Sequence, residues 1–285
     1  MAELSPLWSA RLDHLCLTSP NPEAMIGFYR DALGMNVTET GLAAWRIEGP
    51  GRRLLLRGDA GVGLDFAGFA VADDARLLAL RAHIEAQGGE LTDNPSPFYQ
   101  QGGFAVRDPD GNQFCFGVVE NDAAGDATRD VAAIGGRLQH VVVASADLQA
   151  MMTYYEQVLG FLPSDYVRAD DGAISAAFYR SDDEHHSFAV FRAPESRLDH
   201  HAYETPSWNH IRDWADHLST LEIPIWWGPG RHGVGNNLFF MVEDPDGNKV
   251  EFSSEIEEVG PEVIAREWPH GPRALNLWGP AWMRS

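Results

Sequence analysis

The chain has 285 residues, enough for two domains of common size, and 44% of them are apolar, so a sizeable core can be buried. The formal net charge of -21 repels phosphate groups and argues against nucleic acid and anionic membranes as partners. No long apolar run predicts a membrane span, no N-terminal pattern predicts a secretory signal, and Cys16 and Cys115 form no disulfide framework, so we expect a cytoplasmic protein.

The first half of the chain alternates strand-like and helix-like segments. Residues 11–19, RLDHLCLTS, have the pattern of a strand, and the Asn-Pro-Glu run at 21–23 predicts a helix that Gly34 ends. A second helix is predicted after the two aspartates at 73–74, ending at the glycine pair 88–89. Short strands are expected after each helix.

The second half repeats the first. RLQHVVVAS at 137–145 resembles RLDHLCLTS with an offset of 126 residues, and DPDGNKVEF from Asp244 resembles DPDGNQFCF from Asp108 with an offset of 136. The order of the matches is kept while the offset grows, as in a duplicated module with small insertions. The Asp-Pro-Asp-Gly-Asn run predicts a tight turn between two strands. Together these patterns predict a β-α-β-β-β unit that occurs four times, an α+β protein.

The duplication predicts two domains. The first covers residues 1–120 and the second residues 137–285, including a C-terminal tail. Residues 121–136 between them are polar and rich in glycine and alanine, which is typical of a linker.

The two copies differ in their chemistry. His14 aligns with His140, and the two other aligned pairs of interest are Ala67 with His201 and Cys115 with Glu251. Only the second copy therefore has two histidines and a carboxylate at three strand positions. Such a facial triad suits Fe(II) and leaves positions open for substrate and O2. Each histidine alone would more simply be a hydrogen-bonded core residue, and Glu251 alone a solvent-facing one. The coincidence across the repeat favours the metal site.

At these residues the chain resembles the type I extradiol ring-cleaving dioxygenases of the vicinal oxygen chelate superfamily. The resemblance runs from about Arg11 to the tryptophan-rich tail, and it is carried by RLQH, LDHHAYE, GPGRHGVGN and DPDGNKVEF. It implies four βαβββ units in two duplicated domains, with the metal in the C-terminal domain and a degenerate N-terminal domain that binds none. It further implies Fe(II), or Mn(II) with the same ligands, an aromatic diol and O2 as small-molecule partners, and a homo-oligomer.

The resemblance also assigns roles to two further histidines. His186 lies fifteen residues before His201 and matches the family's acid–base histidine, while His232, in GPGRHG, matches a histidine that contacts substrate or oxygen. His14 is interpreted as structural. An ordinary glycine-rich turn is the alternative interpretation of GPGRHGVGN.

One position departs from the family pattern. Many members have a pocket tyrosine nine residues after the histidine of GPGRHG, and this chain has Met241 there. The enzyme then cleaves the ring with His186 and His232 alone, takes a substrate that needs no phenol, or runs another reaction of the superfamily. Tyr203 is a weaker candidate to replace the missing hydroxyl, because strand tyrosines more often pack.

The remaining pocket walls are predicted from aromatic residues. Trp227, Phe178 and Phe188 are candidates, although core packing explains them equally well. The tail from residue 266 reads as an extended segment over the domain surface or the pocket mouth. Two rival functions remain open, which are another metal-dependent reaction of the superfamily (hydroquinone-type cleavage or an isomerase) and a binding protein without catalysis.

Overall fold

The predicted order of elements is observed. The structure is a computed structural model that describes residues 4–119 and 134–283. Residues 121–133 of the predicted linker lie outside these ranges.

The first half contains two units that each run strand, helix and three strands. The first unit comprises β1 (Arg11–Ser19), α1 (Pro22–Asp31), β2 (Asn36–Gly41), β3 (Ala44–Gly49) and β4 (Arg52–Gly58). The second comprises β5 (Gly63–Ala70), α2 (Asp74–Ala86), β6 (Leu91–Asp93), β7 (Phe104–Arg107) and β8 (Gln113–Gly117).

The second half repeats this order and adds a tail. Its first unit comprises β9 (Arg137–Ser145), α3 (Leu148–Thr153), η2 (Tyr154–Leu159), β10 (Leu162–Arg168), β11 (Ile174–Arg180) and β12 (Phe188–Arg192). Its second comprises β13 (Arg197–Glu204), α4 (Trp208–Thr220), β14 (Trp227–Arg231), β15 (Leu238–Glu243) and β16 (Lys249–Ser254). The tail contributes β17 (Arg266–Pro269) and α5 (Pro272–Leu275).

Local signals explain the helix boundaries. The Asp73 side chain accepts a hydrogen bond from the backbone N–H of Arg76 at 2.8 Å and caps α2. Pro22 occupies the first turn of α1, where its missing N–H is not needed. The helix that follows β9 is not an α-helix throughout, because its second part, η2, is a π-helix. The cytoplasmic location stays a prediction; no helix of the described residues is long and apolar enough to cross a membrane.

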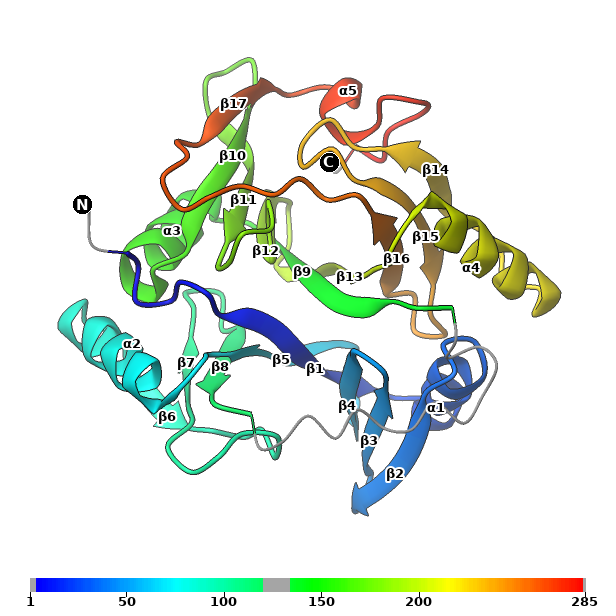
Figure 1. Ribbon diagram of the computed structural model, residues 1–285, viewed down its shortest axis with the longest axis horizontal. Coiled ribbons are helices and arrows are strands. Elements are labelled where there is room, and N and C mark those ends of the chain that lie inside the picture. The colour runs from blue at the N-terminus through cyan, green and yellow to red at the C-terminus, as the bar shows by residue number, and fades with distance from the viewer. Residues whose placement is uncertain (1–3, 120–133, 284–285) are drawn as a thin grey trace.

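Each half forms one mixed sheet. The strand order is β2-β3-β4-β1-β5-β8-β7-β6 in the first and β14-β15-β16-β13-β9-β12-β11-β10-β17 in the second. The paired units therefore meet at their first strands, β1 with β5 and β9 with β13. In Figure 1 the halves lie one above the other, with β1 and β9 side by side between them and α2 and α4 on the outside. The predicted fold class, two duplicated halves of βαβββ units, is confirmed.

Candidate metal centre and active site

Three side chains meet on neighbouring strands β9, β13 and β16 of the second sheet. Ala202 pairs with His140 on one side and with Glu251 on the other, so these two share its face of the sheet. His200 lies two residues before Ala202 and points to the same face. The Nε2 atoms of His140 and His200 are 3.3 Å apart. Oε2 of Glu251 lies 3.8 Å from the former and 3.5 Å from the latter.

The prediction that His201 completes this triad is wrong in the structure, where His200 takes that place. His201 pairs with Val141 and Val250, which face the opposite side of the sheet. There its Nε2 lies 3.3 Å from the hydroxyl of Tyr29. Burial, with the neighbouring His200 and His140, lowers the pKa of His201 to about 3, so this residue is a neutral core histidine. A strand exposes only every second residue to one face, so just one member of the His-His pair can reach the site.

Hydrogen bonds fix the orientation of both triad histidines. Nδ1 of His140 lies 2.5 Å from the side-chain oxygen of Gln139, and Nδ1 of His200 lies 2.6 Å from the Asp199 carboxylate. Because an amide oxygen and a carboxylate accept, each Nδ1 carries the proton and each Nε2 keeps its lone pair for the site. Partners of this kind orient metal-bound histidines and raise their basicity. Burial lowers the pKa of His140 against the opposing effect of Glu251, which keeps its imidazole neutral.

The Glu251 carboxylate is the anion of the site. Its side chain is 1% exposed, and Oε1 accepts a hydrogen bond from the Asn237 amide at 3.2 Å. Burial alone would raise the pKa of Glu251, but the facing imidazoles of His140 and His232 outweigh burial and hold the pKa well below its usual range. Oε2 is buried and accepts no hydrogen bond from any residue that the structure describes.

These residues fit a divalent metal ion. The candidate ligand atoms of His140, His200 and Glu251 all lie within 4.8 Å of one another. Ligands at about 2.1 Å from one ion lie about 3.0 to 3.4 Å apart for angles between octahedral and tetrahedral values. The observed spacing of 3.3 to 3.8 Å is close to that range. A cation would also give the unpaired Oε2 a partner, which a buried carboxylate oxygen requires.

The two other predicted histidines line the same pocket. The ring of His186 lies 4.5 Å from the ring of His140, and burial together with His140 and His185 holds the pKa of His186 well below its usual range. His232 places Nε2 3.8 Å from Glu251, while Nδ1 contacts the backbone oxygen of Leu275. Its ring stacks on Phe239 with centroids 3.8 Å apart. Nε2 of His232 thus faces the triad, and the His186 ring lies beside the ring of His140.

The predicted pocket-wall residues divide into two groups. Met241, Trp227 and Phe178 line the pocket around the triad. Tyr203 and Phe188 do not, and these two predictions are wrong: both point into the main core on the opposite faces of β13 and β12, for the same reason as His201. The Tyr203 hydroxyl therefore does not replace the phenol that Met241 lacks.

Several residues of the pocket wall were not predicted from the sequence. The pocket is also lined by Val142, Phe191, Val234, Ala274 and Leu275. The last two come from α5, so the tail closes the pocket. The Trp227 indole N–H holds the tail in place by donating to the Pro280 backbone oxygen at 2.8 Å. The inner pocket has a volume of about 20 Å³. A cavity of about 520 Å³ adjoins it and shares Phe191, Ala274 and Leu275. A polar residue stands just before each of the two histidine ligands, Gln139 before His140 and Asp199 before His200, and this pattern could have indicated His200 as the ligand.

The equivalent place in the first half is filled by protein. Nδ1 of His14 lies 2.8 Å from the Asp13 carboxylate and Nε2 lies 2.8 Å from the Ser96 hydroxyl. The position that corresponds to His200 is Phe66, and Cys115 stands where the second half has Glu251. Both nitrogens of His14 have partners, which agrees with its interpretation as structural.

A family model decides the relationship. The model of the Glyoxalase/Bleomycin resistance protein/Dioxygenase superfamily matches residues 11–116 and 137–252, one match in each half. The chain belongs to this superfamily. Its predicted resemblance to the extradiol dioxygenases is confirmed at the level of relatives. It is 28% identical to Metapyrocatechase 2 of Cupriavidus necator, over 94% of this chain and 88% of the relative.

Two other superfamily relatives carry a metal in their names. An iron-dependent extradiol dioxygenase of Rhodococcus jostii is 26% identical over 76% of this chain and 77% of the relative. A manganese-dependent 2,3-dihydroxybiphenyl 1,2-dioxygenase of Geobacillus genomosp. 3 is 25% identical over 86% of this chain and 85% of the relative.

Solved structures of the superfamily share the whole fold. The Mn(II)-bound glyoxalase from Novosphingobium aromaticivorans superposes with a TM-score of 0.79 and 28% identity, covering 95% of this chain and 91% of that one. Homoprotocatechuate 2,3-dioxygenase from Arthrobacter globiformis gives a TM-score of 0.81 at 24% identity, covering 98% and 90%.

Proposed function

We propose that the protein is an extradiol dioxygenase that cleaves the ring of a catechol-type substrate with O2 at one divalent metal ion. The observation that carries this proposal is the buried set of His140, His200 and Glu251, whose open side faces a pocket with two further histidines. The names of the relatives support it. We also propose residues 137–285 as the catalytic domain, residues 1–120 as a domain without metal, and a cytoplasmic homo-oligomer.

Different residues of the chain would bind the metal, transfer the proton and hold the substrate or oxygen. His140, His200 and Glu251 would hold the ion, which when bound supplies Lewis-acid activation of a vicinal diol and positions for substrate and O2. His186 is neutral at neutral pH because burial depresses its pKa, so its free nitrogen can accept a proton from a diol oxygen and later return one. His232 would hold substrate or oxygen through Nε2, because the Leu275 carbonyl occupies its Nδ1–H.

We propose Fe(II) as the resident ion, with Mn(II) as the alternative. Two imidazoles and one carboxylate suit both ions, and the relatives include an iron-dependent and a manganese-dependent enzyme. Metal analysis of protein purified without added metal, followed by reconstitution with each ion, separates these alternatives.

The pocket favours a diol with an apolar substituent. Val142, Phe178 and Met241 line the inner pocket, and its volume of about 20 Å³ requires that side chains move before a ring enters. The adjoining cavity of about 520 Å³, lined largely by small apolar residues, has room for a second ring. Met241 offers a polarizable apolar surface where a phenol would offer a hydrogen bond.

A second candidate function is a metal-dependent reaction that consumes no oxygen. The solved structure titled as a Mn(II)-bound glyoxalase resembles this chain at 28% identity over nearly its full length, and Met241 removes a pocket hydroxyl. Oxygen consumption distinguishes the two candidates.

The test is O2 uptake by protein purified anaerobically and loaded with Fe(II). The panel comprises catechol, 3-methylcatechol, 2,3-dihydroxybiphenyl and hydroquinone, and Glu251→Ala is the control variant. We expect one O2 per vicinal diol, a yellow ring-opened product, and no activity in Glu251→Ala. Bound iron without O2 uptake on any diol would overturn the proposal in favour of the non-oxidative reaction.

A further inference from the structure

A chain of hydrogen bonds runs from His186 away from the metal site. Nδ1 of His186 lies 3.0 Å from Nδ1 of His185, and Nε2 of His185 lies 3.0 Å from Oδ2 of Asp165. Both histidines are buried, and the Asp165 side chain is completely inaccessible to solvent. Water therefore does not compete for these contacts, and the protein alone sets where the protons lie.

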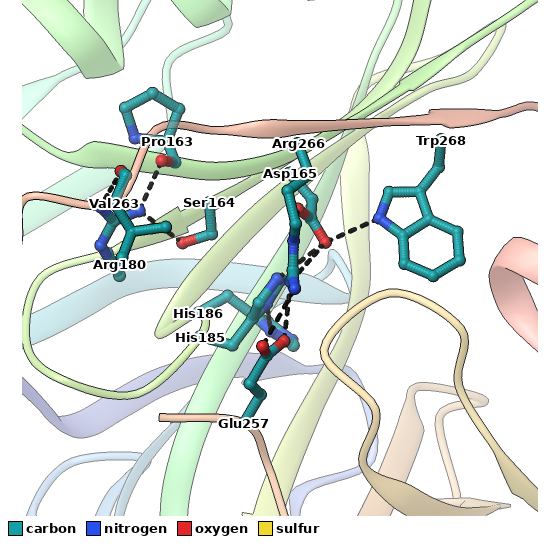
Figure 2. Close-up of polar contacts among 10 residues, drawn as sticks. All are labelled: Pro163, Ser164, Asp165, Arg180, His185, His186, Glu257, Val263, Arg266 and Trp268. Carbon is teal, nitrogen blue, oxygen red and sulfur yellow. Dashed lines mark hydrogen bonds and ion pairs between the residues drawn. The ribbon is translucent and has the colours of Figure 1, made fainter. Parts of the chain in front are cut away.

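The Asp165 carboxylate is itself fixed by the C-terminal tail. Its two oxygens accept from the Arg266 guanidinium at 2.7 and 3.1 Å, and Oδ2 also accepts from the Trp268 indole N–H at 2.9 Å. Figure 2 shows Arg266 between the carboxylates of Asp165 and Glu257, with the Trp268 ring nitrogen aimed at Asp165. Burial would raise the pKa of Asp165, but the hydrogen bonds from His185 and Arg266 outweigh it, so the pKa is lowered and the group is an anion.

A second anchor holds the same tail next to this cluster. The Arg180 guanidinium donates to the backbone oxygens of Pro163 on β10 and of Val263 in the segment that leads into the tail, as Figure 2 shows. This segment and the tail thus lie against β10 on both sides of Asp165.

The positions of the protons follow from the acceptor at the end of the chain. A carboxylate only accepts, so Nε2 of His185 carries a proton. The two facing Nδ1 atoms, 3.0 Å apart, share one proton, because one must donate and the other accept. In the neutral form of His185, the proton on Nε2 leaves a lone pair on Nδ1. Nδ1 of His186 must supply the proton between the two rings, which leaves Nε2 of His186 unprotonated.

We propose that His185 and Asp165 are positioning residues that hold His186 in the tautomer whose unprotonated Nε2 serves the pocket. The proposal rests on the proposed function only where it gives that nitrogen a role in proton transfer from the diol. The tautomer itself does not require turnover. In use, the diol O–H bond breaks, an N–H bond forms at Nε2 of His186, and the resulting imidazolium keeps donating through Nδ1 to His185. Asp165 thereby plays the orienting role that a carboxylate plays behind a histidine base in hydrolase triads.

The first test reads the tautomer directly. The protein is labelled with 15N at histidine and loaded with Zn(II), a diamagnetic ion that accepts the same ligand types. The signals of His186 are assigned by their loss in His186→Gln. We expect a protonated Nδ1 and an unprotonated Nε2. A proton on Nε2 of His186 in the wild-type protein overturns the proposal.

Asp165→Leu is the informative variant. It removes the carboxylate that accepts from the Nε2–H of His185, so that proton is no longer held on Nε2 and the His186 tautomer should become mixed. Glu257 still pairs with Arg266, so the tail keeps a charged partner. We expect kcat to fall at least about tenfold with little change in KM, because a wrongly protonated base removes part of the contribution of acid–base catalysis. An unchanged His186 tautomer in Asp165→Leu contradicts the proposal.

Two further variants separate positioning from folding. Glu257→Gln removes the other carboxylate on Arg266 and keeps the Glu257 backbone oxygen that accepts from the His185 N–H, so the tautomer and kcat should stay close to wild type. His185→Phe keeps a ring but removes the acceptor of the His186 proton, so it should give mixed tautomers and a lowered kcat even if Asp165→Leu fails to fold. If the wild-type protein cleaves no diol yet shows the expected tautomer, the proposed function fails and the positioning inference stands.

Discussion

Glu204 at the end of β13 is a partly buried carboxyl group whose hydrogen bonds only partly offset the cost of burying its charge. Its Oε2 accepts from the Ser253 hydroxyl at 2.6 Å and its Oε1 from the backbone N–H of Ile256 at 3.3 Å. Burial outweighs these hydrogen bonds and raises the pKa of Glu204 from 4.5 to about 7. The folded state therefore binds a proton at this residue more tightly than the unfolded state does.

The pH dependence of stability follows from that difference. Between about pH 4.5 and pH 7 the folded state holds the proton and the unfolded state does not, so this residue's contribution to stability is full at low pH and is lost as pH rises. The loss amounts to at most about 3 kcal/mol. Glu204→Gln stays neutral and should lose no stability from this source. Urea unfolding at pH 5 and pH 8 checks this: the variant's stability relative to wild type should increase with pH, and a pH-independent difference would contradict the assignment.

At the scale of the element, rows of inward-facing side chains on β9 to β12 shape the pocket. Val142, Ala189 and Phe178 pair across three strands, and Val142 and Phe178 line the inner part. The next row outward contains Ala144, Phe191 and Ala176. The small side chain of Ala176 leaves room for the cavity of about 520 Å³ that adjoins the site.

Filling that cavity should change specificity. Ala176→Phe places a ring where the second ring of an aryl-substituted diol would lie. We expect kcat/KM for 2,3-dihydroxybiphenyl to fall at least about tenfold, because an excluded apolar group changes discrimination by about 1–3 kcal/mol. The value for catechol, measured on the same preparation, is the control and should change much less. An equal loss for both diols would show that the cavity does not receive the substituent.

At the scale of the whole molecule, the two halves exchange matching contacts. Tyr29 on α1 donates to Asp244 in the turn of the second half at 3.3 Å, and Tyr155 on η2 donates to Asp108 in the turn of the first half at 2.5 Å. The tyrosines and the turns are equivalent positions of the duplicated sequence. Each half thus closes a turn of the other with a buried phenol.

Removing one of these phenol hydroxyls should lower the free energy of unfolding of the protein. Tyr155→Phe loses a buried hydrogen bond to Asp108 and should lower the free energy of unfolding by about 1.5–3 kcal/mol. The hydroxyl of the adjacent Tyr154 makes no hydrogen bond to any residue that the structure describes, so Tyr154→Phe should be neutral or slightly stabilising. Urea unfolding measures both. Equal effects of the two substitutions would contradict the role given to the Tyr155–Asp108 contact.

Part of the fold and of the candidate site could be predicted from the sequence. The duplication, the βαβββ order and the face that His140 and Glu251 share all follow from repeats and from strand spacing. The choice between His200 and His201 does not, because a bulge between Leu198 and His200 shifts the pairing of β13 with β9. The pairing of Asp165 with His185 and the closure by α5 also depend on contacts between segments distant in the chain, which no local pattern records.

Metal binding by two matched variants tests the account most directly. His200→Ala and His201→Ala remove neighbouring histidines of the same strand, and the Fe(II) or Mn(II) retained after dialysis is measured for each alongside wild type. We expect His200→Ala to lose at least about a hundredfold in affinity, more than the loss of an outer partner causes, while His201→Ala keeps one ion per chain and is only less stable. Retention of the metal by His200→Ala together with its loss from His201→Ala would contradict the site described.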